Sequence, residues 1–168
     1  MESRAKLAGH AIHPMLITLP LGLLATAVVF DILYLITETD GFATASFYMI
    51  AAGIIGGLLA AVFGLWDWLV IPAGTRAKRI GLLHGVGNVV VVLLFAVSWL
   101  LRRGQGGYQP DGLAFWLGVV AVLLALATAW AGGELVERLG VGVDPGANLD
   151  APSSLSGPAT RRQRTVEP

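Results

Sequence analysis

The chain has 168 residues, of which 55% are hydrophobic and only 13% are charged. An average soluble domain carries about 25% charged residues, so this chain has too few polar side chains to cover a soluble fold. Its formal net charge of zero argues against a nucleic-acid-binding protein. It contains no cysteine, which excludes disulfides, thiolate metal sites and iron–sulfur clusters from this chain. The composition therefore predicts a membrane protein.

Four long stretches of the chain lack a formal charge: they lie between Lys6 and Asp31, Asp40 and Asp67, Arg79 and Arg102, and Asp111 and Glu134. A helix needs about 20 apolar residues to cross a bilayer, and each stretch is long enough. Strands of a membrane β-barrel would be about ten residues long and strictly alternating, which these stretches are not. We therefore predict an all-α, integral membrane four-helix bundle, with helices over residues 14–36, 45–70, 80–101 and 113–132.

The lysines and arginines predict the orientation of these helices. With four spans, the N-terminus, the loop after the second helix and the C-terminus lie on one side of the membrane. Nine of the 11 lysines and arginines lie on that side, and the other two, Arg102 and Arg103, lie on the opposite side. Because positively charged loops stay in the cytoplasm, both termini of this multi-pass protein are predicted to be cytoplasmic.

The chain changes character after residue 143. Residues 1–143 form the predicted four-span domain, whereas residues 144–168 contain four of the eight prolines together with serine, glycine and asparagine. Such a segment cannot bury enough apolar surface to fold. We predict that residues 144–168 form a disordered cytoplasmic tail.

Small residues follow one side of the second predicted helix and let helices approach closely in lipid. They are Gly53, Gly57, Ala60, Ala61 and Gly64. Three interpretations remain open for this side: packing within the bundle, a homodimer face, or a flat surface for a planar cofactor. At the outer end of the first helix, Asp31 is expected to lie at the membrane interface.

Polar residues from the predicted helices come to one level near the cytoplasmic side. His10 and His13 precede the first helix, Asp67 lies just before the end of the second, and His84 lies about four residues into the third with Asn88 one turn deeper. Ionisable groups are costly inside a membrane and mark functional sites, although side chains near an interface can also reach water. The candidate metal ligands are His10, His13, His84 and Asp67, and the candidate cofactor-binding residues are His10, His13, His84 and Asn88.

Several short motifs stand at these positions: Gly9–Pro14 with Pro20–Gly22, Gly64–Trp68, Leu82–Gly85 with Asn88, Gly132–Val136 and Gly140–Val143. Together they resemble the domain of unknown function 2231 family, a group of small bacterial membrane proteins, over about residues 7–143. The family is often written with a basic residue or histidine near Leu139 and an aromatic near Glu137, and this chain has neither. Relatives are sometimes fused to a Rieske iron–sulfur domain, which this cysteine-free chain lacks. The resemblance implies a four-helix, multi-pass protein of a bacterial inner membrane, in contact with the lipid bilayer, and it points to redox work with a redox partner.

Three functions remain open from the sequence. The first is a haem b-binding protein, in which His84 and either His13 or His10 ligate the iron from two helices and a basic loop at residues 76–79 faces the propionates. The second is a metal-binding or proton-coupled transport unit built on the candidate metal ligands. The third is a structural or assembly subunit without chemistry. Independent catalytic activity is not expected, because the sequence lacks a zinc-protease motif, a phosphate-binding glycine loop and a serine nucleophile elbow.

Overall fold

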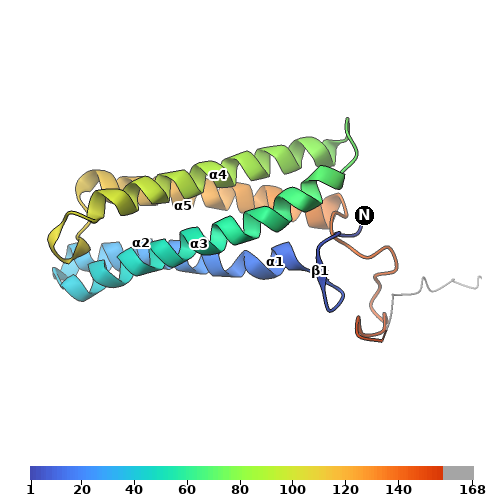
Figure 1. Ribbon diagram of the computed structural model, residues 1–168, viewed down its shortest axis with the longest axis horizontal. Helices are drawn as coiled ribbons and strands as arrows, with labels where there is room; N and C mark the ends of the chain where they lie inside the picture. Colours follow the sequence, from blue (N-terminus) through green and yellow to red (C-terminus); the bar gives the residue numbers. More distant parts are fainter. Residues whose placement is uncertain (157–168) are drawn as a thin grey trace, which may run out of the picture.

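The computed structural model describes residues 1–156 as an elongated bundle of four long helices (Figure 1). Four helices are long and apolar enough to cross a membrane, over Ile12–Thr37, Asp40–Val70, Arg76–Arg102 and Gly106–Arg138. The predicted fold class is therefore confirmed. Of the predicted tail, residues 157–168 lie outside the described residues.

The chain begins with a small antiparallel hairpin, β1 (Lys6–Leu7) and β2 (His10–Ala11). The first span consists of α1 (Ile12–Leu16) and α2 (Thr18–Thr37), and the second is α3 (Asp40–Val70). The third is α4 (Arg76–Arg102), and the fourth is α5 (Gly112–Gly133) extended by a π-helical turn over Glu134–Arg138. A short 3₁₀ turn at Gly106–Tyr108 lies between α4 and α5.

Local chemistry explains several helix boundaries. Thr75 caps α4 by accepting a hydrogen bond from the backbone N–H of Lys78, and Asp111 caps α5 through the N–H of Ala114. The first span breaks between α1 and α2, three residues before Pro20. Because proline has no N–H, it leaves the carbonyl four residues earlier, that of Leu16, without its helical donor, and the helix breaks there.

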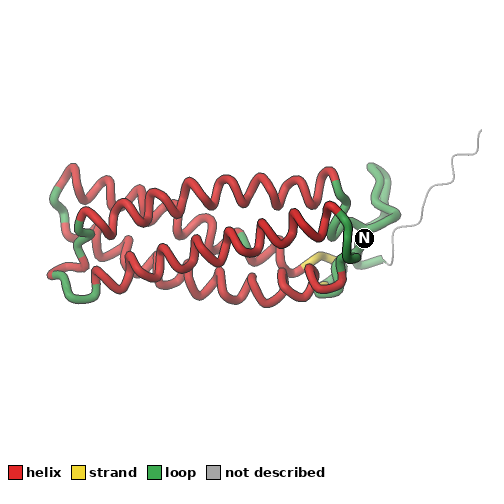
Figure 2. The backbone as a smooth tube through the Cα atoms, turned by 90° about the horizontal axis from the view of Figure 1, so that it is seen from above, coloured by secondary structure: helices red, strands yellow, loops and turns green. Residues whose placement is uncertain are grey.

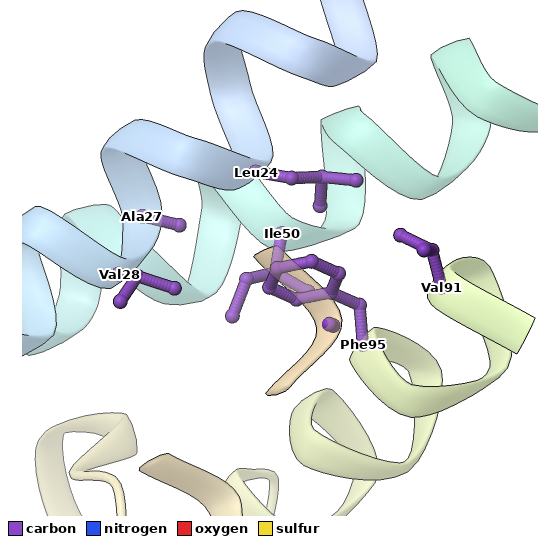
Figure 3. Close-up of a cluster of buried hydrophobic side chains, with 7 residues drawn as sticks. Leu24, Ala27, Val28, Ile50, Val91 and Phe95 are labelled. Carbon is purple, nitrogen blue, oxygen red and sulfur yellow. The ribbon is translucent and has the colours of Figure 1, made fainter. Parts of the chain in front are cut away.

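The helices form a square arrangement. α2 packs along α3 and α4 along α5, while α3 against α4 and α2 against α5 close the bundle. Consequently α2 and α4 stand at opposite corners, as do α3 and α5 (Figure 1). The central core is small (Figure 3) and consists of Leu24, Ala27, Val28, Ile50, Val91, Phe95 and Ala121. Most other large apolar side chains face outward, as expected for a bundle in contact with lipid.

The two ends of the bundle differ in character. The "histidine end" is where α1 and α4 begin and where α3 and α5 finish, and the "Arg102 end" is the opposite one. Both the N-terminal segment and the chain after α5 lie at the histidine end (Figure 2), where the N–H of Gly142 donates to the carbonyl of Met1 at 2.7 Å. Residues 144–156 contain turns but neither helix nor strand, and Ser154 Oγ donates to the carbonyl of Ala8 at 3.0 Å. Which end faces the cytoplasm remains a prediction.

The depth of Asp31 in the membrane stays a prediction, but its side chain lies inside the bundle and not against lipid or water. Asp31 is 1% exposed and forms a bidentate ion pair with Arg102, which is fully buried. Arg102 also donates to Ser46 Oγ on α3 and to Ser98 Oγ on its own helix. Arg102 is the last residue of α4 and turns its long side chain back into the bundle. The residue spacing along α2 or α4 alone therefore could not reveal that Asp31 pairs with it.

Candidate functional site

His13 lies in the first helical turn of the chain and leans against α3. Its Nδ1 is 2.9 Å from the carbonyl oxygen of Ala60. One turn further along α3, Gly64 provides the space for the ring, since a Cβ atom at that position would come within 2.8 Å of His13 Cε1. The absence of a side chain at Gly64 therefore lets the imidazole sit directly on the α3 backbone.

His84 repeats the same arrangement on the other half of the bundle. Its Nδ1 is 2.8 Å from the carbonyl oxygen of Thr128 on α5. Four residues further on, Gly132 borders the ring, where a Cβ atom would lie 3.1 Å from His84 Cε1. In both cases a histidine binds a carbonyl of the neighbouring helix and packs on a glycine four residues later.

The two imidazoles approach each other across the bundle. Their ring centroids are 6.3 Å apart, and the rings are nearly perpendicular at 87°. They come from α1, which leads into α2, and from α4, and these stand at opposite corners. The prediction that His84 lies near one of the N-terminal histidines therefore agrees with the geometry, and the partner is His13.

The tautomer of both rings follows from their partners. A backbone carbonyl only accepts hydrogen bonds, so each Nδ1 must carry the proton. In a neutral imidazole the other nitrogen, Nε2, then carries the lone pair that can bind a metal. A carbonyl that accepts from Nδ1–H in this way is one of the partners that orient histidine ligands in metal sites.

Asn88 belongs to the same site, as its position one turn below His84 suggested. Its Nδ2 donates to the carbonyl of His84 at 2.8 Å and lies 3.4 Å from His84 Nε2. Its Oδ1 accepts from Thr128 Oγ1 at 3.1 Å. Sequence reasoning missed Thr128, although a signal was present, since it is the only residue of α5 with a hydroxyl group.

His10 and Asp67 make different contacts. His10 lies on the exposed hairpin, with Nδ1 3.2 Å from the carbonyl of Ala8 and 3.4 Å from Ser154 Oγ. Asp67 accepts hydrogen bonds from Ser3 Oγ and from the backbone N–H of Arg4. Within residues 1–156, no three His, Asp or Glu side chains come together in an arrangement suited to a metal ion.

The basic loop before α4 is engaged with neighbouring helices. Arg76 Nη2 forms a 2.6 Å ion pair with Glu134 Oε1, two residues beyond the glycine that borders His84. Lys78 Nζ donates to the carbonyl of Trp68 at 2.7 Å and lies over the Trp68 ring. These contacts tie the start of α4 to the ends of α3 and α5 and hold the histidine end together.

A family model described as "Predicted membrane protein (DUF2231)" matches residues 9–145 of the chain. The matched range includes both facing histidines, Asn88 and Thr128. Neither a curated protein nor a solved structure matches the chain.

Proposed function

The chain belongs to the domain of unknown function 2231 family of predicted membrane proteins, and we propose that it binds haem b in the bilayer and serves in electron transfer, with His13 and His84 as the two iron ligands. The observation that carries this proposal is the facing pair of imidazoles, each anchored through Nδ1 to a backbone carbonyl. Histidine is a common axial ligand of haem iron, and helical bundles hold cofactors between side chains of facing helices.

The separation of the two rings supports axial ligation. Two metal–nitrogen bonds of about 2 Å, with about 1 Å more from each nitrogen to its ring centre, put the centroids of two axial imidazoles about 6 Å apart. In the structure the centroids are 6.3 Å apart. This agreement supports the proposal that the two rings would hold one iron atom through their Nε2 atoms.

The number of side-chain ligands favours haem over a bare metal ion. A porphyrin supplies four equatorial nitrogens, so two histidines complete the coordination of its iron. A metal ion held by protein alone takes four or more ligands, or three with an open position. Within residues 1–156, no carboxylate or further histidine joins His13 and His84 to form such a site. The metal-binding or transport alternative would need His10 or Asp67, and both have other partners.

The proposal includes a place in the cell and a partner. We place the protein in a bacterial inner membrane, as its family resemblance implies, and the distribution of lysine and arginine supports a histidine end that faces the cytoplasm. Electron transfer at this site would need a second molecule that gives or takes the electron, so we propose a redox partner at or near the histidine end.

The test is an absorbance spectrum of the protein purified in mild detergent after expression with ample haem. We expect a Soret band that is lost or strongly weakened in His84→Ala and in His13→Ala. His10→Ala is the matched control, because it removes a histidine three residues away and should retain the band. Circular dichroism establishes that each variant is folded.

A colourless, folded preparation at full haem supply would overturn the proposal. Elemental analysis of that sample then separates the two remaining functions. Stoichiometric metal would favour the metal-binding unit, and its absence would favour a structural or assembly subunit.

A further inference from the structure

The first five residues cross the histidine end of the bundle between α3 and α5. We call residues 1–5 the N-terminal strap. At one side, Ser3 Oγ is 2.8 and 2.7 Å from the two carboxylate oxygens of Asp67 on α3, and the N–H of Arg4 donates to Asp67 Oδ1 at 2.9 Å. At the other side, the carbonyl of Met1 accepts from the N–H of Gly142, beyond the end of α5.

The strap lies directly beyond the histidine pair. α3 and α5 are the two helices whose carbonyls hold His13 and His84. Asp67 is three residues beyond Gly64, on which the His13 ring packs, so the attachment point of the strap is about 4.5 Å further along the helix axis. The N-terminal strap therefore lies across the end of the bundle that is nearest to the two imidazoles.

The strap is also linked to His13 through the chain itself. The N–H of Ile12 donates to the carbonyl of Ala5 at 2.9 Å, which closes the β1–β2 hairpin against the start of α1. Ser3 and Ala5 are only 6% and 7% exposed. A displacement of the strap would thus expose the end of the bundle and loosen the segment that positions His13.

The strap is held mainly by polar contacts. Its two buried side chains, those of Ser3 and Ala5, are small. Its attachments are the hydrogen bonds to Asp67 on α3 and, beyond α5, those from the Met1 ammonium to the carbonyl of Gly140 and from the N–H of Gly142 to the carbonyl of Met1. Segments with few buried apolar contacts are the ones that open locally while the rest of a protein stays folded.

We propose that the N-terminal strap is a lid over the histidine pair and that Asp67 holds it closed. The identity of the molecule that the lid admits, haem, rests on the proposed function. The movement of the lid itself can be measured without haem. Weakening the contact to Asp67 should open the histidine end to molecules from water.

The test uses the absence of cysteine from the chain. A single thiol is introduced by His84→Cys, and its reaction with a water-soluble maleimide is followed in the haem-free protein in detergent. Adding Asp67→Asn removes the charge that Ser3 and Arg4 bind while keeping the size of the side chain. Hydrogen bonds to a charged group are among the stronger ones, so we expect labelling to become about tenfold faster.

Two further variants make the result specific. Glu137→Gln is the matched control, because it makes the same chemical change at the same end without touching the strap, and it should leave the labelling rate unchanged. Ser3→Ala removes one donor and leaves the N–H of Arg4, so it should give a smaller acceleration even if Asp67→Asn disturbs folding. Equal labelling rates in all these proteins, or an equal acceleration by Glu137→Gln, would overturn the lid.

Haem uptake separates this inference from the proposed function. If both hold, Asp67→Asn in the otherwise native chain should speed the appearance of the Soret band after haem is added. If labelling accelerates but no haem binds to any variant, the lid stands and the haem proposal fails. If haem binds and labelling does not respond, the lid alone fails.

Discussion

Arg102 donates to both carboxylate oxygens of Asp31, from Nη1 to Oδ1 at 2.7 Å and from Nη2 to Oδ2 at 2.6 Å, and neither side chain is more than 1% exposed. Through Ser46 and Ser98 the pair also reaches α3 and α5, since Ser98 Oγ donates to the carbonyl of Ala114. This network therefore connects all four long helices near the Arg102 end. A buried ion pair adds little stability over a well-packed apolar pair, but removing one partner leaves an uncompensated charge.

We predict that Asp31→Asn and Arg102→Gln each destabilise the folded bundle by about 3 to 5 kcal/mol. The double variant should lose less than the sum of the two single losses, because neither charge is then left unpaired. Unfolding in mixed detergent measures these differences. Arg103→Gln is the control, since that neighbour is exposed and lies over the Trp99 ring, and it should change stability by less than about 0.5 kcal/mol. Additive losses in the double variant would show that the pair is not energetically coupled.

A second prediction concerns the glycines that seat the histidines. A Cβ atom at Gly64 would lie 2.8 Å from His13 Cε1, which is closer than real contacts allow, whereas one at Gly132 would lie 3.1 Å from His84 Cε1. Gly64→Ala should therefore displace the His13 ring and lower the haem content several-fold, and Gly132→Ala should lower it less. The haem-to-protein ratio after gel filtration measures this.

Gly85→Ala provides the control for these glycines, because it lies next to His84 on α4 and a Cβ atom there meets nothing within 4 Å. It should keep the full haem content. If Gly85→Ala lowers the haem content as much as Gly64→Ala does, the effect comes from helix packing in general and not from the contact between each glycine and its imidazole ring.

A third prediction concerns Thr128, whose hydroxyl donates to Asn88 Oδ1 at 3.1 Å and to the carbonyl of Ala125 at 2.9 Å. Thr128→Val keeps the shape of the side chain but leaves the part-buried amide oxygen of Asn88 without this donor. Because a lost hydrogen bond of this kind costs about 1 to 3 kcal/mol, the variant should be destabilised by that amount. Thr128→Ser keeps the hydroxyl and should recover most of the loss in the same unfolding assay. Equal stability of the two variants would show that the hydroxyl does not matter.

The membrane spans could be predicted because charged residues are rare within them. The histidine pair could be predicted because residues at the same depth on different helices of a bundle lie close together. The position of His10 could not be predicted in this way. The sequence puts His10 and His13 at one level before the first helix, but Ala8 and Gly9 adopt positive φ angles of 50° and 82° and turn the chain into a hairpin. The helix therefore begins at Ile12 and leaves His10 outside it.

The contacts that give the site its chemistry were also hidden from the sequence. The imidazoles bind backbone carbonyls of Ala60 and Thr128, and every residue has a carbonyl, so no side-chain pattern marks these two. The same holds for the Asp31–Arg102 pair, which depends on how α2 and α4 are staggered. Sequence periodicity describes one helix at a time, whereas these contacts depend on the packing of several.

The last prediction concerns orientation. The structure puts the N-terminal segment and the chain after α5 at the same end of the bundle, and the lysine and arginine distribution predicts that this end is cytoplasmic. A reporter active only in the cytoplasm should therefore work when fused after Val143, and one active only in the periplasm should not. Fusions in the loop at Gln105, between α4 and α5, should give the opposite pattern and serve as the internal control. A periplasmic signal after Val143 would place the histidine end, the N-terminal strap and the expected redox partner on the outer side of the membrane.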